Sequence, residues 1–287
     1  MATVPSTLIT VAPTGAESSK SDVPTLPCTL EELVSTAKAC QAAGAAVIHV
    51  HVRDADAAPT LDLGYVRAAI AAVREATDLV VQVSTGGAVA DSEAGRLGVL
   101  DSDPDAASLT CGTVNFGADV FMNRWELIEQ LYLGMREREI VPEFELFDLG
   151  HVATMHRLLD RHGEPHGGHV HCDLVMGVPG GMPGTVQALL ACVAALPVEA
   201  TWSATGVGRA TLPVMFGALA AGGHLRVGME DTLTFSAGDA VRDNAQLVER
   251  AAAAAVLAQR PPMPVPEARA MLGVKERRRT TAGTGVR

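Results

Sequence analysis

An alternation of strand-like and helix-like runs constrains the fold of this 287-residue chain more than any other feature. Short apolar runs alternate with Ala- and Leu-rich amphipathic runs about every 30 residues, which is typical of βα units and a parallel sheet. Eight such units predict a single α/β domain over residues 1–274, a (β/α)₈ TIM barrel, with a doubly wound sheet as the alternative. The functional residues of such a barrel lie at the carboxyl ends of its strands.

The pattern also predicts where the elements lie. We expect strands at 8–12, 46–52, 79–84, 108–112, 140–147, 169–177, 199–205 and 224–230. We expect helices at 29–43, 63–76, 124–138, 151–161, 185–195, 211–221 and 239–260. Thr29 with Glu32 has the spacing of a capping box, and Gly44 is a helix stop. Residues 15–26 and 86–105 are expected to be loops over the barrel mouth, and residues 275–287 a disordered tail.

Charge and composition exclude several classes of protein. A net charge of −11 argues against a partner with a phosphate backbone, so we expect no nucleic acid. We expect no membrane either, because no apolar run approaches the roughly 18 residues of a spanning helix. The N-terminus lacks the pattern of a signal peptide, which favours a cytoplasmic protein. The five cysteines have no CxxC spacing and are expected to be reduced.

His49-Val50-His51 ends an apolar run and forms the strongest candidate site. Residues i and i+2 of a strand point to the same side, so both imidazoles can bind one metal ion. Glu230, on the last predicted strand, is the best third ligand, because strands eight and two of a closed barrel are separated by strand one alone. Two imidazoles and one carboxylate with an open position form a catalytic zinc set; interior polar packing is the alternative.

Arg226 and Asp231 flank this third ligand in the sequence. They are either a proton-handling couple beside the metal or a structural ion pair. A second His-x-His pair, His169 and His171, precedes its apolar run instead of following it. That order predicts a structural role at the far end of the barrel.

Other polar residues lie near predicted strand ends. Ser84 to Gly87 form a turn whose hydroxyls and Gly86 and Gly87 amides suit a carboxylate or phosphate, although a plain strand exit is the alternative. Polar side chains on strands four and five, where apolar ones are expected, are further ligand candidates. These are Thr110, Thr113, Glu143 and Glu145.

Seven motifs, in order between Leu8 and Leu272, resemble those of the beta-keto acid cleavage enzyme family. They are Thr14-Gly-Ala-Glu17, His49-Val-His-Val-Arg53, Ser84-Thr-Gly-Gly87, Gly112-Thr-Val-Asn-Phe-Gly117, Gly177-Val-Pro-Gly-Gly181, Gly206-Val-Gly-Arg209 and Gly228-Met-Glu-Asp231. The resemblance implies a zinc-dependent (β/α)₈ acyltransferase that converts a β-keto acid and acetyl-CoA into acetoacetate and an acyl-CoA. It also implies a homo-oligomer, a tetramer by analogy.

The resemblance assigns roles to these residues. It implies that His49, His51 and Glu230 bind zinc and that Arg226 and Asp231 form the catalytic couple. It implies that the substrate carboxylate is held by a further group, which consists of Ser84, Gly86, Gly87 and one of Thr110 and Thr113. Glu17 matches a position that faces a cationic amino group, as in 3-keto-5-aminohexanoate, and Glu143 assists.

Two other functions stay open at this stage. A metal-dependent aldolase or hydrolase on the same barrel would use the two histidines and the glutamate without CoA. A non-catalytic ligand-binding barrel would keep them as interior packing. Acetyl-CoA dependence separates the first alternative from the transferase, and metal content separates the second.

Overall fold

The computed structural model describes residues 5–275. The centre of the fold is a closed barrel of eight parallel strands. The strand order around the barrel is β1-β12-β11-β10-β9-β6-β5-β2. The barrel strands are β1 (Ile9–Val11), β2 (Val47–Val50), β5 (Val80–Val83), β6 (Ala106–Thr110), β9 (Val141–Leu146), β10 (His171–Met176), β11 (Thr201–Gly206) and β12 (His224–Val227). Each overlaps one predicted range, so the predicted (β/α)₈ barrel is confirmed.

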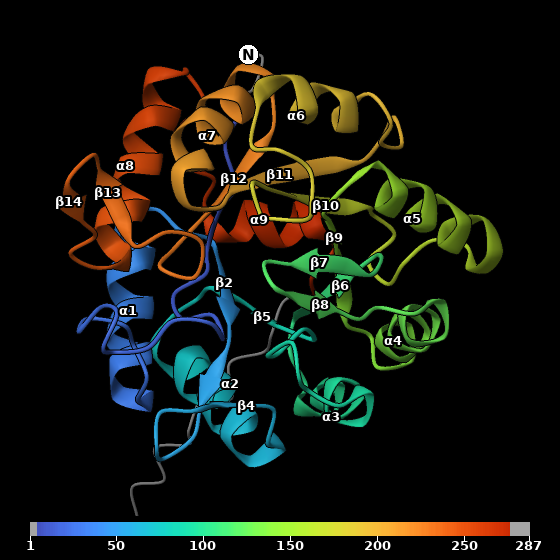
Figure 1. Ribbon diagram of the computed structural model, residues 1–287, viewed down its shortest axis with the longest axis horizontal. Coiled ribbons are helices and arrows are strands. Elements are labelled where there is room, and N and C mark those ends of the chain that lie inside the picture. The colour runs from blue at the N-terminus through green and yellow to red at the C-terminus, as the bar shows by residue number, and fades with distance from the viewer. Residues whose placement is uncertain (1–4, 276–287) are drawn as a thin grey trace, which may run out of the picture.

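The helices form a ring around the strands (Figure 1). They are α1 (Leu30–Ala43), α2 (Leu63–Ala76), α3 (Glu93–Gly98), α4 (Trp125–Glu137), α5 (Leu149–His162), α6 (Val186–Val193), α7 (Thr211–Ala220), α8 (Asn244–Leu257) and α9 (Val265–Leu272). The predicted capping box is present, since Thr29 and Glu32 accept each other's backbone N–H. None of the helices among residues 5–275 is long and apolar enough to cross a membrane.

The structure differs from the sequence prediction mainly in the loops. Residues 86–105, expected to be a loop, contain α3 and the 3₁₀ helix η1 (Val99–Ser102). Three hairpins extend from the mouth of the barrel: β3–β4 (Val52–Arg53 and Pro59–Thr60), β7–β8 (Val114–Phe116 and Asp119–Phe121) and β13–β14 (Thr234–Ser236 and Asp239–Ala240). The last hairpin occupies the start of the range predicted for α8, which therefore begins later. The predicted disordered tail lies outside the described residues, apart from Lys275.

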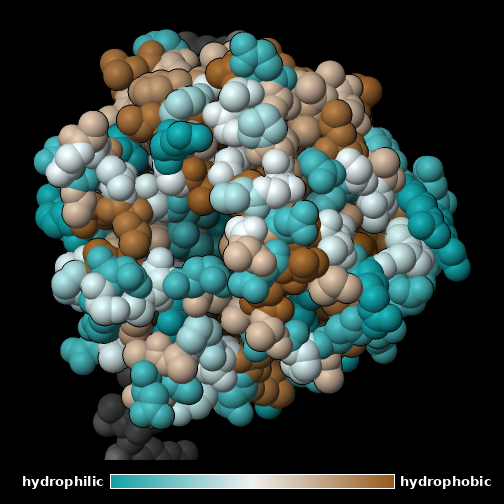
Figure 2. All heavy atoms as spheres, in the orientation of Figure 1, coloured by the Kyte–Doolittle hydropathy of each residue, from teal (hydrophilic) through white to brown (hydrophobic). Residues whose placement is uncertain are grey.

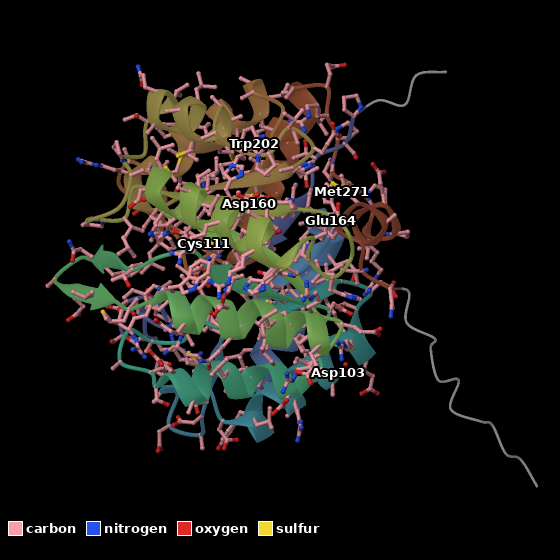
Figure 3. The ribbon with its side chains drawn as sticks, turned by 90° about the vertical axis from the view of Figure 1, so that its right-hand side faces the viewer. Asp103, Cys111, Asp160, Glu164, Trp202 and Met271 are labelled. Atoms are coloured by element: carbon pink, nitrogen blue, oxygen red, sulfur yellow. The ribbon has the colours of Figure 1, made fainter. Side chains whose placement is uncertain are left out.

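Helix α9 closes the end of the barrel opposite the mouth. Its Ala268 and Leu272 belong to a buried cluster with Leu8, Val47 and Val80, residues at or beside the starts of barrel strands. Figure 3 shows α9, where Met271 is labelled, at the opposite end of the barrel from the β7–β8 hairpin.

Candidate active site

A cavity of about 220 Å³ lies at the carboxyl ends of the strands. Figure 2 shows this face of the molecule hollowed near its centre. The cavity is lined by polar side chains from β2, β9 and β12 and from the segments after β1, β2, β5 and β12. An apolar group from β10 and from the segments after β6, β9, β10 and β11 completes the lining. This is the end of the barrel at which the sequence predicted the site.

The two histidines enter this cavity from the end of β2, as alternation along a strand requires. His49 is buried, and its Nδ1 lies 2.5 Å from the amide oxygen of Gln82 on β5. Because that oxygen can only accept, the proton resides on Nδ1 and the lone pair on Nε2. Burial, reinforced by Arg226, lowers the pKa of His49 to about 3, so the ring is neutral.

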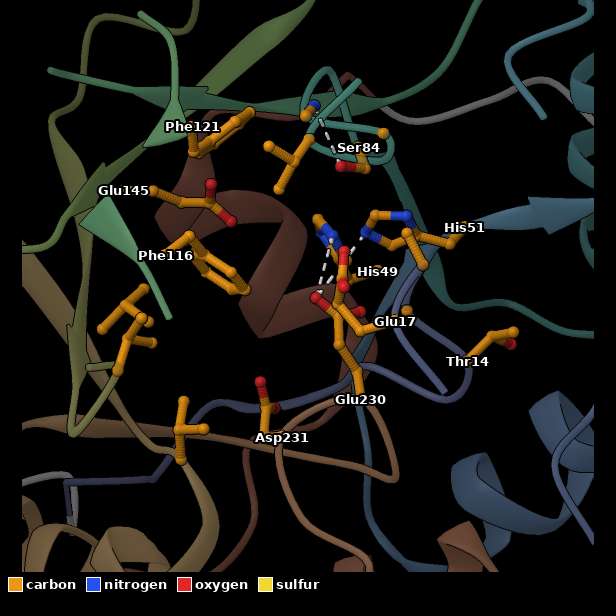
Figure 4. A pocket seen from close by; sticks show the side chains of 18 of the residues that line it. Thr14, Glu17, His49, His51, Ser84, Phe116, Phe121, Glu145, Glu230 and Asp231 are labelled. Atoms are coloured by element: carbon orange, nitrogen blue, oxygen red, sulfur yellow. Dashed lines mark hydrogen bonds and ion pairs between the residues drawn. The ribbon is translucent and has the colours of Figure 1, made fainter. Parts of the chain in front are cut away.

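Glu230 reaches the histidines from a turn and not from a strand. Strand β12 ends at Val227, three residues earlier than predicted, and the Glu230 N–H donates to Ala12 O at 3.1 Å. Gly228 makes this turn possible, because a Cβ at that position would lie 1.9 Å from Ala12 O. The carboxylate oxygen Oε1 lies 3.6 Å from His51 Nε2 and 4.0 Å from His49 Nε2 (Figure 4, dashed lines).

These three side chains fit a metal ion. One ligand atom from each of His49, His51 and Glu230 lies within 4.8 Å of the other two. The second carboxylate oxygen of Glu230, Oε2, is buried without a hydrogen-bond partner, which is costly unless a cation faces it. The Gln82 contact orients the His49 ring from behind, as outer partners of metal-binding histidines do.

Arg226 joins four carboxylates beneath the mouth. Its guanidinium lies 3.1 Å from Glu145, 3.2 Å from Asp231 and 3.9 Å from Asp173, and it also contacts Glu230. The sequence predicted a pairing of Arg226 with Asp231, and the structure brings the two together. The partners on β9 and β10 lie 81 and 53 positions away in the sequence, and no sequence pattern indicated them.

The carboxyl groups of this network and the neighbouring Glu143 have different pKa values. Burial alone would raise the pKa of Glu230, but Arg226 and the two imidazoles hold it well below its usual range. Burial raises the pKa of Asp231 to about 7 and that of Asp173 to about 6, although Arg226 opposes both shifts. Burial and the neighbouring Asp173 raise the pKa of Glu143 to about 8. Of these four carboxyl groups, Glu230 is the one whose pKa is lowered, so it stays ionised.

The turn after β5 borders the cavity as expected. Ser84, Gly86 and Gly87 all line it, and Ser84 Oγ accepts the Gly86 N–H at 3.1 Å. That bond leaves the Ser84 hydroxyl proton free to donate to a substrate oxygen.

The other candidates from strands four and five lie deeper or elsewhere. Thr110 donates to Glu145 at 2.8 Å, and Thr113 accepts the N–H of Asn123. Neither threonine lines the cavity, and neither does Glu143, which is buried next to His171. Glu145, which lies two residues further along β9 and on the same face of the strand, does line the cavity. Residue alternation identifies inward-facing side chains but not their depth in the barrel.

Glu17 lies in the loop after β1, where it is exposed and borders the cavity. Arg53 holds this loop through Nη2, which donates to Gly15 O and Ser18 O, both at 2.7 Å. The sequence placed Arg53 beside the histidines without a role, and the structure makes it the anchor of the Glu17 loop.

The second histidine pair lies at the end of the barrel opposite the mouth, as predicted: His171 is the first residue of β10 and His169 lies two residues before it. His169 Nε2 and His171 Nδ1 both contact Thr201 Oγ1, and His171 Nε2 lies 3.2 Å from Ser203 Oγ. The hydroxyls of β11 thus satisfy these rings.

No sequence pattern indicated the apolar side of the cavity. Phe116 packs against Phe121 and Phe147 with ring centroids 6.4 Å apart in each pair. We call the set of cavity-lining side chains on this side the apolar wall; it comprises Phe116, Phe121, Phe147, Val175, Val178 and Val207. Figure 4 shows Phe116 and Phe121 across the cavity from His51 and Glu17.

Known proteins similar to this chain show the family to which it belongs. A model of the family described as beta-keto acid cleavage enzyme matches residues 6–274. The 3-keto-5-aminohexanoate cleavage enzyme of Acetoanaerobium sticklandii is 36% identical, over 94% of this chain and 98% of that protein. The 3-oxoadipate:acetyl-CoA acetyltransferase of Cupriavidus necator is also 36% identical, over 93% of this chain and 94% of its own length.

A solved structure supports the fold. The apo structure of ObcA superposes with a TM-score of 0.74 at 20% identity, over 88% of this chain and 66% of the ObcA chain. At that identity the similarity bears on the barrel architecture and on nothing finer.

Proposed function

From the premise that this chain belongs to the beta-keto acid cleavage enzyme family, we propose that it transfers an acyl group from a β-keto acid to CoA. The substrates are a β-keto acid and acetyl-CoA, and the products are acetoacetate and a new acyl-CoA. Several relatives are named as acetyl-CoA-dependent transferases, which supports this pairing of substrates. The observation that carries the proposal is that His49, His51 and Glu230 converge in one cavity beside Asp231.

The donor set suits zinc, with His49, His51 and Glu230 as its ligands. When bound there, zinc would polarise the keto and carboxylate oxygens of the substrate and make its CH₂ group more acidic. Ser84 donates its hydroxyl proton to the carboxylate, and the Gly87 amide lies in the same turn. Thr110 acts indirectly, by fixing Glu145.

Asp231 is the base, since it lines the cavity and a guanidinium resists deprotonation. It removes a proton from the CH₂ group, and the resulting carbanion attacks the thioester carbon of acetyl-CoA. CoA thiolate leaves and then adds to the original keto carbon. The bond between that carbon and the former CH₂ carbon breaks, Asp231 returns the proton to carbon, and acetoacetate and acyl-CoA result. Arg226 holds Asp231 in position and balances its charge.

The experiment that tests this proposal follows β-keto acid consumption with and without acetyl-CoA. We expect consumption to require acetyl-CoA and to yield one acetoacetate and one acyl-CoA per acid consumed. Equal rates with and without acetyl-CoA would instead indicate an aldolase or hydrolase. The homo-oligomer stays a prediction, for which the mass in solution is the measurement.

Glu17 supports an amino group on the substrate, because its carboxylate is exposed at the cavity edge. We expect Glu17→Gln to raise KM for an amino-substituted acid and to leave KM for a neutral acid of the same length unchanged. An equal change in KM for both acids would mean that Glu17 does not bind the amino group.

A further inference from the structure

The apolar wall points to the substrate class within the proposed function, on which this inference rests. We propose that the β-keto acid ends in an uncharged, apolar group larger than methyl, and that this group packs against the wall. The carboxylate and keto oxygen lie on the opposite side, beside His49, His51 and Ser84. A cationic amino substituent is compatible only on that side, where Glu17 lies (Figure 4).

Burial indicates that the wall is a binding surface and not an entrance. Phe147 and Val175 are each 5% exposed, and Val178 is 4% exposed, although all three line the cavity. Side chains so little exposed lie inside the cavity, away from the rim. An apolar group placed against them leaves water without removing any polar group from it.

Charge excludes an acidic end group at the wall. Among the described residues that line the cavity, Arg226 is the one Lys or Arg side chain, and it is already paired with four carboxylates. Glu145, the acidic residue beside the wall, accepts from Arg226 and Thr110. A second carboxylate on the substrate would find no free cation and would be repelled by Glu145.

Size argues that the wall binds the keto acid and not the bulk of CoA. The cavity of about 220 Å³ is smaller than the roughly 300–1,000 Å³ of pockets that hold drug-sized ligands. It has room for a small keto acid and the reactive end of a thioester, so the nucleotide of CoA must remain outside the mouth.

The sharpest test compares neutral-ended β-keto acids of increasing length with a dicarboxylic acid of equal carbon count. Binding to the purified, metal-loaded protein is measured by calorimetry without acetyl-CoA, for 3-oxopentanoate, 3-oxohexanoate, 3-oxoheptanoate and 3-oxoadipate. We expect Kd to fall about three- to fourfold with each added CH₂ group. We expect 3-oxoadipate to bind at least about tenfold more weakly than 3-oxohexanoate, which lacks its second carboxylate. A Kd independent of length, or tightest binding of 3-oxoadipate, would overturn the inference.

A pair of matched variants tests whether the apolar wall contacts the keto acid. Val178 and Val114 belong to the same buried cluster and are each 4% exposed, but Val178 alone of the two lines the cavity. Val178→Thr should weaken binding of 3-oxohexanoate by about tenfold, because the added hydroxyl would face an apolar group. Val114→Thr should leave that Kd unchanged. If Val178→Thr changed the affinity for acetyl-CoA and not for the keto acids, the wall would belong to CoA and the inference would fail.

Turnover separates this inference from the proposed function. If the acids bind in the expected order but acetyl-CoA yields no acetoacetate, the proposed reaction is wrong while the binding preference stands. If acetoacetate forms at equal kcat/KM from acids of every length, the reaction stands and the preference is wrong.

Discussion

The chain contains the tripeptide His-Val-His twice, and the two copies have different surroundings. His49 and His51 end β2 and face the ionised carboxylate of Glu230 at the mouth. His171 begins β10, where the hydroxyls of Thr201 and Ser203 satisfy it. A glutamate, Glu143, lies 3.5 Å from His171 as well, but burial raises its pKa to about 8. One pair therefore faces an ionised carboxylate, whereas the carboxyl group beside the other stays protonated up to about pH 8.

The largest effect is expected from His49→Ala. Loss of this ligand should remove the metal and lower kcat/KM by roughly 10⁴-fold, because the substrate oxygens would lose their electrophile. Metal analysis should show zinc near one equivalent per chain in the wild type and near none in the variant. Retention of zinc in the variant would mean that His49 is not a ligand and would contradict the assignment of the metal site to His49 and His51.

Asp231→Asn is expected to lower kcat by about 10³-fold without loss of metal, because it removes the base but no ligand. Asp173→Asn is the matched control, since Asp173 also faces Arg226 but does not line the cavity. Steady-state kinetics and metal content are measured for both. An equal loss in the two variants would assign Asp231 to the structural network and not to the chemistry.

Glu143→Gln probes the interior beside His171 through stability. Glu143 stays protonated in the folded protein up to its pKa of about 8, whereas in the unfolded chain it ionises near 4.5. Between these values the folded state binds up to one more proton than the unfolded chain, so the free energy of unfolding falls as pH rises, by at most about 1.4 kcal/mol per pH unit. Urea unfolding between pH 5 and 8 should show a shallower decline in the variant. The exposed Glu199→Gln is the control, and an unchanged slope in Glu143→Gln would contradict the raised pKa.

His169→Ala should have the smallest effect. His169 makes one hydrogen bond to Thr201 and lies away from the cavity, so we expect a loss of about 1 kcal/mol in stability and kcat/KM close to that of the wild type. Thermal unfolding and activity are measured beside His51→Ala, which should lose metal and activity. Similar activity losses in the two variants would contradict the assignment of a catalytic role to His51 and a structural role to His169.

Much of the site could be predicted from the sequence, because strand alternation and barrel closure are simple geometric rules. They brought His49, His51 and Glu230 together correctly and separated them from His169 and His171. The rules could not show that Glu230 belongs to a turn, because Gly228 ends the strand through a contact with Ala12 that is distant in the sequence.

Other features lay outside what local patterns can indicate. Phe147 and Val178 of the apolar wall have the same sequence signature as ordinary core residues, so their exposure to a cavity was invisible. Helix α3, capped by Ser92, lies in a polar segment that resembled a loop. Glu143 and Glu145 share a strand face, and the sequence could not tell which of them lies at the mouth.

The tight packing of Gly228 on Ala12 has a consequence for inheritance. A single added methyl group there would collide with the Ala12 carbonyl and push the adjoining turn outward, while His49, His51 and Glu230 kept their identity. A gene copy could therefore lose this arrangement of side chains although the codons for all three residues were intact.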